Sequence, residues 1–148
     1  MNNTKQIDMA ISFLSRAGNK LEEAKTSQKA MHNPESISSS TECIEMSLKA
    51  IFLLVTETYP KGHEFSEAEF EVALAKMPEQ LEFMNFGRLY LLHKLWSTFD
   101  SVAKYGFDTF GVGPEKVFQK DEAALAIKHA EECRHAGDAL LNWVRYSK

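Results

Sequence analysis

Apolar residues recur three and four positions apart along most of this chain, and this is the period of one face of an α-helix. The first such segment spans residues 5–28, and others span residues 34–58, residues 79–106 and the stretch that starts near Asp121. No useful length of sequence alternates apolar and polar residues, as a half-buried β-strand would. Long amphipathic helices with short connections pack as antiparallel neighbours. The sequence therefore predicts an all-α fold, a four- to five-helix up-and-down bundle in a single domain over residues 1–148.

Three apolar stripes predict which helix faces are buried. In the first helix the stripe consists of Ile7, Ala10, Leu14, Ala17, Leu21 and Ala24. In the second it consists of Cys43, Ser47, Ala50, Ile51, Leu54 and Val55, and in the last of Ile127, Ala130, Cys133, Gly137, Leu140 and Val144. The second helix also has apolar residues on its other side, so we expect it to be central or to lie in a dimer interface. Small residues in the last stripe allow another helix backbone to approach closely.

Proline and glycine mark the connections between the helices. Asn33 followed by Pro34 predicts an N-cap and a first helical residue. Pro78 is expected to end a short third helix and to open the fourth, over residues 79–106. Glycines and a proline predict a loop from residue 106 to residue 113.

A capping box precedes the short third helix, which is predicted at residues 67–76. Ser66 and Glu69 have the spacing at which each side chain bonds the other residue's backbone N–H. Phe65 and Phe70 flank this pair at the positions of a hydrophobic staple.

The charge of the chain is unevenly distributed. Lysine and arginine number 17 against 21 acidic residues, giving a net charge of -4, whereas a protein that binds nucleic acid through bulk charge is basic. Residues 86–120, however, carry five basic and three acidic side chains. A phosphate-bearing ligand is therefore expected to meet this middle segment.

Other features predict a cytoplasmic protein without metal or cofactor. The longest apolar run, residues 50–55, is far shorter than the roughly 20 residues of a membrane span. The first six residues contain no apolar region and no cleavage site, so no signal peptide is predicted. Cys43 and Cys133 lack metal-ligand spacing and occupy apolar helical positions, which predicts reduced thiols in the core.

Four motifs occur in order along the chain. Residues 45–50 read Glu-Met-Ser-Leu-Lys-Ala, and a turn with proline and histidine follows at residues 60–65. Residues 104–106 read Lys-Tyr-Gly, and residues 123–139 form a helical segment rich in alanine and acidic residues. In this order the motifs resemble those of the HEPN family of nucleotide-binding and RNase-related domains. They are similar to its acidic-x-small-Leu-Lys-Ala stretch with the turn after it, its basic-Tyr-Pro element with glycine in place of proline, and its last helix. The resemblance implies a helical bundle, commonly dimeric, that is associated with nucleotides or RNA. It also implies a nucleotidyltransferase-type partner in a toxin–antitoxin-like pair.

The RNase-active branch of the family has an arginine followed by four to six residues and a histidine, and Arg88 and His93 satisfy this spacing. The resemblance implies metal-independent cleavage, with His93 as general acid or base and Arg88 stabilising the charged transition state. On a straight helix, however, the two side chains point about 140° apart, so they converge only at a distortion or across a dimer axis. Leu89 also departs from the polar residue usual after the arginine. The alternative is that both are surface or boundary residues.

Lys49, His63, Lys104 and Tyr105 are the candidate nucleotide-binding residues, each with a structural alternative. Lys49 would bind phosphate, or would extend its stem along apolar surface and pair with Glu45, four residues earlier. His63 would contact a ligand at the N-terminus of the third helix, or would orient the turn. Lys104 and Tyr105 would offer a charge and a stacking ring to a nucleotide, or Tyr105 would be an aromatic residue at the core edge.

Three functions follow as expectations. The first is a nucleotide- or RNA-associated binding module, dimeric and paired with another protein. The second is an RNase toxin that uses Arg88 and His93, and the third is a structural interaction domain with the aromatic stripe of the fourth helix as its interface. His129 and His135 lie among charged neighbours and are expected to be solvated.

Overall fold

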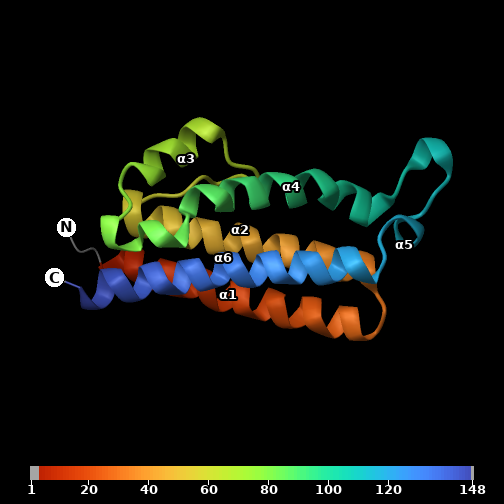
Figure 1. Ribbon diagram of the computed structural model, residues 1–148, viewed down its shortest axis with the longest axis horizontal. Coiled ribbons are helices and arrows are strands. Elements are labelled where there is room, and N and C mark those ends of the chain that lie inside the picture. Colours follow the sequence, from red (N-terminus) through yellow and green to blue (C-terminus); the bar gives the residue numbers. More distant parts are fainter. Residues whose placement is uncertain (1–3, 148) are drawn as a thin grey trace.

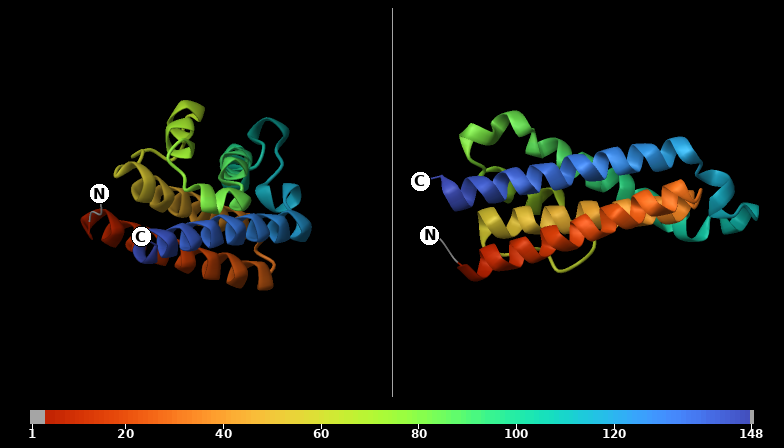
Figure 2. Two further views of the ribbon diagram at one scale, coloured as in Figure 1. Left: turned by 60° about the vertical axis from the view of Figure 1, so that its left-hand side comes forward. Right: turned by 90° about the horizontal axis from the view of Figure 1, so that it is seen from below.

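Helix α2 (Asn33–Thr56) lies at the centre of the molecule. In the computed structural model, α1 (Thr4–Lys29) and α6 (Lys120–Tyr146) pack against it, and α4 (Phe86–Tyr105) covers a face of α2 that α1 does not reach (Figures 1 and 2). The four long helices alternate in direction along the chain (Figure 1). The predicted all-α up-and-down bundle is confirmed, and the predicted central position of the second helix is correct.

The structure describes residues 4–147. Residues 1–3 and Lys148 lie outside the described part, so the prediction that the first six residues form no signal peptide falls partly on undescribed sequence. The single domain predicted for residues 1–148 stays a prediction. No helix of the described residues is long and apolar enough to cross a membrane.

The core forms where the predicted stripes meet. The buried stripe residues are Ala10, Leu14, Ala17, Leu21, Ala24, Cys43, Ser47, Ala50, Ile51, Ile127, Ala130, Cys133, Gly137 and Leu140. The other four, Ile7, Leu54, Val55 and Val144, are partly exposed. Both cysteines are free thiols inside this core, as predicted. A Cβ atom at Gly137 would lie 2.7 Å from Cδ2 of Leu14, so α6 and α1 approach as closely as the small residue allows.

The predicted fourth helix over residues 79–106 is wrong in its first part. A 3₁₀ helix spans Glu79–Met84, and α4 begins only at Phe86. Between them Asn85 adopts the left-handed conformation with a φ of 54°, and asparagine is among the few residues that enter this region at low cost. The apolar periodicity runs through both elements, so the sequence pattern did not reveal the break.

The start of α2 also differs from its prediction. His32 is the N-cap residue, without a side-chain hydrogen bond, and Asn33 is already helical. The side-chain oxygen of Asn33 is buried and has no hydrogen-bond partner, so it does not cap the helix.

The capping box at α3 (Glu67–Leu74) is confirmed. Ser66 Oγ accepts from the Glu69 N–H at 3.1 Å, and the Ser66 N–H donates to Glu69 at 3.0 Å. Phe65 and Phe70 are both buried and pack edge-on against Phe52 of α2.

The loop predicted at residues 106–113 projects beyond the end of the bundle (Figure 1). It contains a short 3₁₀ turn, Asp108–Phe110, and a single bridge between Phe107 and Val112. The short helix α5 (Pro114–Val117) follows and leads into α6, which begins at Lys120, one residue before the predicted Asp121.

Candidate functional site

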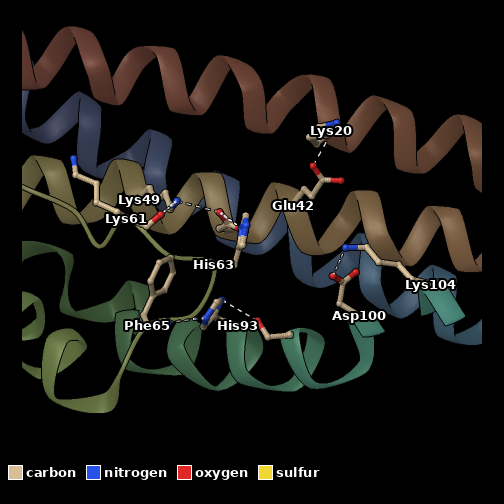
Figure 3. Close-up of polar contacts among 11 residues, drawn as sticks. Lys20, Glu42, Lys49, Lys61, His63, Phe65, His93, Asp100 and Lys104 are labelled. Carbon is tan, nitrogen blue, oxygen red and sulfur yellow. Dashed lines mark hydrogen bonds and ion pairs between the residues drawn. The ribbon is translucent and has the colours of Figure 1, made fainter. Parts of the chain in front are cut away.

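A groove of about 550 Å³ lies between α2, α4 and the connection of residues 57–65, which follows α2. Three of the four predicted nucleotide-binding residues line it: His63, Lys104 and Tyr105. They come from two segments that are far apart in the sequence. Figure 3 shows His63 on the connection that crosses in front of α2, and Lys104 at the far end of α4.

The buried carboxylate of Glu45 forms the floor of this groove. The residue is 7% exposed, and its carboxylate lies 3.1 Å from Nζ of Lys49 and 3.1 Å from Nδ1 of His63. Lys49 is equally buried and also donates to the carbonyl oxygen of Lys61 at 3.5 Å. Lys49 therefore does not line the groove. It makes the predicted ion pair with Glu45 and holds the connection against α2.

His63 lies over Glu45 with its side chain 91% exposed. The predicted position at the N-terminus of α3 is not where its ring points, because the hydrogen bond goes to Glu45 on α2. The residue combines a solvent-accessible imidazole with a buried anionic partner, an arrangement that can present one ring nitrogen to a ligand.

Lys104 and Tyr105 form the other end of the groove. Nζ of Lys104 lies 3.0 Å from Oδ2 of Asp100, and this hydrogen bond and charge raise the pKa of Lys104 above its ordinary value. The ammonium group has three donors, so one ion pair leaves donors for a second anion. Tyr105 is 70% exposed, and its ring is therefore accessible for stacking instead of belonging to the core edge.

Four carboxylates line the groove, and three of them are already in ion pairs. Figure 3 shows Glu42 paired with Lys20 and Asp100 paired with Lys104, and the first of these distances is 3.5 Å. Glu45 has the partners given above. Glu64 is the only lining carboxylate without an ion pair among the described residues. The ion pairs therefore offset most of the negative charge of the groove, leave Glu64 unpaired within the described residues, and keep the groove rich in hydrogen-bond acceptors.

Contacts made by side chains hold most of the connection of residues 57–65 in place. The ring of Tyr59 packs edge-on against Phe13 of α1, and Nζ of Lys61 lies 3.8 Å from the Tyr59 ring centre. At the end of the connection, the N–H of Phe65 donates to Nε2 of His93 on α4 at 3.3 Å.

Arg88 and His93 point to different neighbours on α4. The guanidinium of Arg88 makes a two-pronged pair with Glu132 of α6, at 2.6 and 3.2 Å, which raises the pKa of Arg88. His93 is 2% exposed and stacks on the ring of Phe65, with centroids 4.3 Å apart. The structure does not bring the two side chains together within one chain.

His93 is neutral in this environment. Burial, with a smaller contribution from Lys94, lowers the pKa of His93 to about 4. Nε2 accepts from a backbone N–H, so a neutral ring carries its proton on Nδ1, which faces Ser97 Oγ at 3.4 Å. Both ring nitrogens are therefore engaged inside the protein.

His129 is buried, so the prediction that it is solvated is wrong. Its Nδ1 accepts from the indole N–H of Trp96 at 2.9 Å, and burial, followed by the charge of Arg88, lowers its pKa. His135 is exposed, as predicted. The pairing of His129 with Trp96 joins two helices whose relative positions the sequence pattern does not fix.

Asp100 and Glu42 were not among the predicted site residues. The spacing of Asp100 to Lys104, i to i+4, is a sequence signal that would have indicated the first of them.

Within residues 4–147, no three histidine, cysteine or carboxylate side chains gather as metal ligands do. Burial raises the pKa of both cysteine thiols, that of Cys43 to about 11, so neither favours a reactive thiolate.

A family model described as the HEPN domain matches residues 10–140 of the chain. The chain belongs to the HEPN family. This match includes all groove residues as well as Arg88 and His93. The family membership predicted from the four motifs is thus confirmed, and it supports a nucleotide- or RNA-related module in general.

The HEPN fold of this chain is similar to the crystal structure of TT1696 from Thermus thermophilus. The TM-score is 0.66 at 18% sequence identity, and the similarity covers 88% of this chain and 97% of TT1696. Identity this low shows a shared fold alone. No curated protein matches the chain.

Proposed function

We propose that this HEPN domain is a nucleotide- or RNA-associated binding module whose ligand site is the groove between α2 and α4. One observation carries the proposal: His63, Lys104 and Tyr105, chosen from the sequence as nucleotide contacts, line a single groove. Lys49, the fourth candidate, supports the site indirectly by orienting Glu45.

The chemistry of the groove favours a nucleotide with few phosphates. Tyr105 offers a ring face to a base, and Lys104 offers a charge to one phosphate. The carboxylates near His63 accept hydrogen bonds from ribose hydroxyls and base amino groups, but they repel additional phosphates. A nucleoside monophosphate therefore fits the charge distribution better than a triphosphate.

Calorimetric titration and thermal shift with AMP, GMP and the corresponding triphosphates test this proposal. Tyr105→Ala is expected to weaken monophosphate binding by about tenfold, since stacking contributes about 1–3 kcal/mol per base. Tyr146→Ala is the matched control, because Tyr146 on α6 is also 70% exposed but lies outside the groove. The proposal is wrong if no nucleotide raises the melting temperature at millimolar concentration, or if the two variants weaken binding equally.

We further propose that the domain forms a homodimer and pairs with a nucleotidyltransferase-type protein in a toxin–antitoxin-like system. Exposed apolar side chains on two of the long helices, Leu91 at 60% and Leu125 at 44%, support an interface there. Light scattering of the wild type and of Leu91→Glu tests the dimer. A monomeric wild type would contradict it.

The RNase alternative has less support from the geometry. His93 is neutral, and both of its ring nitrogens are engaged, so catalysis would require the connection at Phe65 to open. We expect no cleavage of a mixed RNA substrate by the wild type. Cleavage that His93→Ala and Arg88→Ala both abolish would establish the alternative instead.

A further inference from the structure

A second groove meets the first at Lys104 and Tyr105. It has a volume of about 410 Å³ and lies between the first turns of α2, the end of α4 and Pro114. Both grooves include Lys104 and Tyr105 among their lining residues, so these two side chains form the boundary between them.

The second groove differs from the first in its chemistry. Its lining from α2 consists of the hydroxyls of Ser38 and Ser39 and one carboxylate, Glu35. It therefore offers hydrogen bonds with less negative charge than the first groove, which has four carboxylates. Each groove falls within the range of about 300–1,000 Å³ that is usual for small-molecule sites.

The boundary residues suit the junction between two nucleotides. Lys104 is half-exposed, and its ammonium keeps donors beyond the one that Asp100 accepts. An ammonium group at this junction would neutralise the phosphate that links two nucleosides. The exposed ring of Tyr105 can stack on a base, as aromatic side chains do in sites for single-stranded nucleic acid.

We propose that the ligand site runs through both grooves and binds a stretch of two ribonucleotides, with the linking phosphate at Lys104. This inference rests on the proposed function and deepens it, because it extends the ligand from one nucleotide in the first groove to two across both grooves. The first groove holds one nucleoside through its carboxylates, and the second holds the next nucleoside through the serine hydroxyls.

Calorimetry with AMP and with the ribodinucleotide pApA tests the two-groove site. The wild type is expected to bind pApA about tenfold or more tightly than AMP, a difference of about 1.4 kcal/mol. Ser38→Trp fills the second groove and should reduce pApA affinity to that of AMP while AMP affinity stays the same. Ser38→Ala removes one of the two serine hydroxyls but leaves the second groove open, so it should lower the preference for pApA over AMP only in part.

A second variant keeps the test decisive if Ser38→Trp does not fold. Glu35 is exposed on the first turn of α2, so Glu35→Arg is expected to fold, and it replaces the carboxylate that lines the second groove by a cation. This substitution should raise the affinity for pApA several-fold and leave the affinity for AMP unchanged. Equal affinities of the wild type for AMP and pApA would overturn the two-groove site and leave the proposed function standing. Binding of neither ligand would overturn both.

Discussion

The charge of His93, a residue of α4, is determined by its burial beneath the connection of residues 57–65. The ring is 2% exposed and accepts a hydrogen bond from the Phe65 N–H, so a proton on Nε2 would both break this bond and place a charge in the core. The pKa of His93 is therefore lowered to about 4 from an ordinary value of 6.5.

This lowered pKa predicts a loss of stability in acid. Between pH 6.5 and 4 the unfolded chain binds a proton at His93 and the folded chain does not, so this contribution is complete above 6.5 and is lost as the pH falls towards 4. The loss is on the order of 3 kcal/mol in the free energy of unfolding. His93→Gln keeps an acceptor without a titrating ring, and urea unfolding across this range should show a shallower decline.

The exposed His135→Gln is the control for exchanging a histidine on the surface. If His93→Gln declines as steeply as the wild type and His135→Gln, the charge state assigned to His93 is wrong.

Contacts between side chains were predictable only where the two partners lie a few positions apart in the sequence. The pair of Glu45 with Lys49 follows from their i to i+4 spacing. The contact of Glu45 with His63 spans 18 positions and a turn, and its existence depends on the path of the connection over α2. Periodicity carries no information about such a path.

At the scale of elements, two glycines inside long helices have different roles. A Cβ at Gly18 of α1 would meet the flexible end of the Arg134 side chain, at 2.9 Å. A Cβ at Gly137 of α6 would lie 2.7 Å from the packed Leu14 side chain and 3.6 Å from the carbonyl oxygen of Ser47. Only Gly137 is required for close helix packing.

The substitutions Gly18→Ala and Gly137→Ala should therefore change stability in opposite directions. Gly18→Ala is expected to stabilise the fold by up to about 1 kcal/mol, the usual helix preference of alanine over glycine. Gly137→Ala should destabilise it, because overpacking costs about 1–3 kcal/mol and exceeds that gain. Urea unfolding of both variants is the measurement, and a stabilising Gly137→Ala would contradict the packing described for α1 and α6.

The break before α4 depends on the left-handed conformation of Asn85. Asn85 has a φ of 54°, so Asn85→Gly should leave stability nearly unchanged, whereas Asn85→Ala should cost about 1–2 kcal/mol. A continuous helix over residues 79–105, as the apolar pattern alone suggested, would instead make Asn85→Ala more stable than Asn85→Gly by about 1 kcal/mol. An Asn85→Ala variant that is as stable as Asn85→Gly, or more stable, would contradict the left-handed conformation of Asn85.

The helices themselves were predictable, and their interruptions were not. Stripes such as Ala10 to Ala24 give the buried face directly, because burial selects apolar residues at the helical period. The left-handed conformation of Asn85 and the start of α2 at Asn33 depend on local backbone dihedral angles. An asparagine in the sequence does not indicate which conformation its backbone adopts.

At the scale of the whole molecule, the central position of α2 determines where a ligand can bind. Helices α1 and α6 are its main neighbours, and α4 packs against a further face of it. The polar residues Glu42 and Glu45 of α2 thus face the groove that α4 and the connection leave open. The family and the bundle were predictable from the sequence, but the groove arises only when α4 is placed on α2.

Mapping of nucleotide binding by backbone amide chemical shifts tests the central claim most directly. Titration with AMP is expected to shift the amides around His63, Asp100 and Tyr105, and to leave those on the outer faces of α1 and α6 unchanged. Shifts confined to α1 and α6, or no shifts at saturating nucleotide, would contradict a ligand site between α2 and α4.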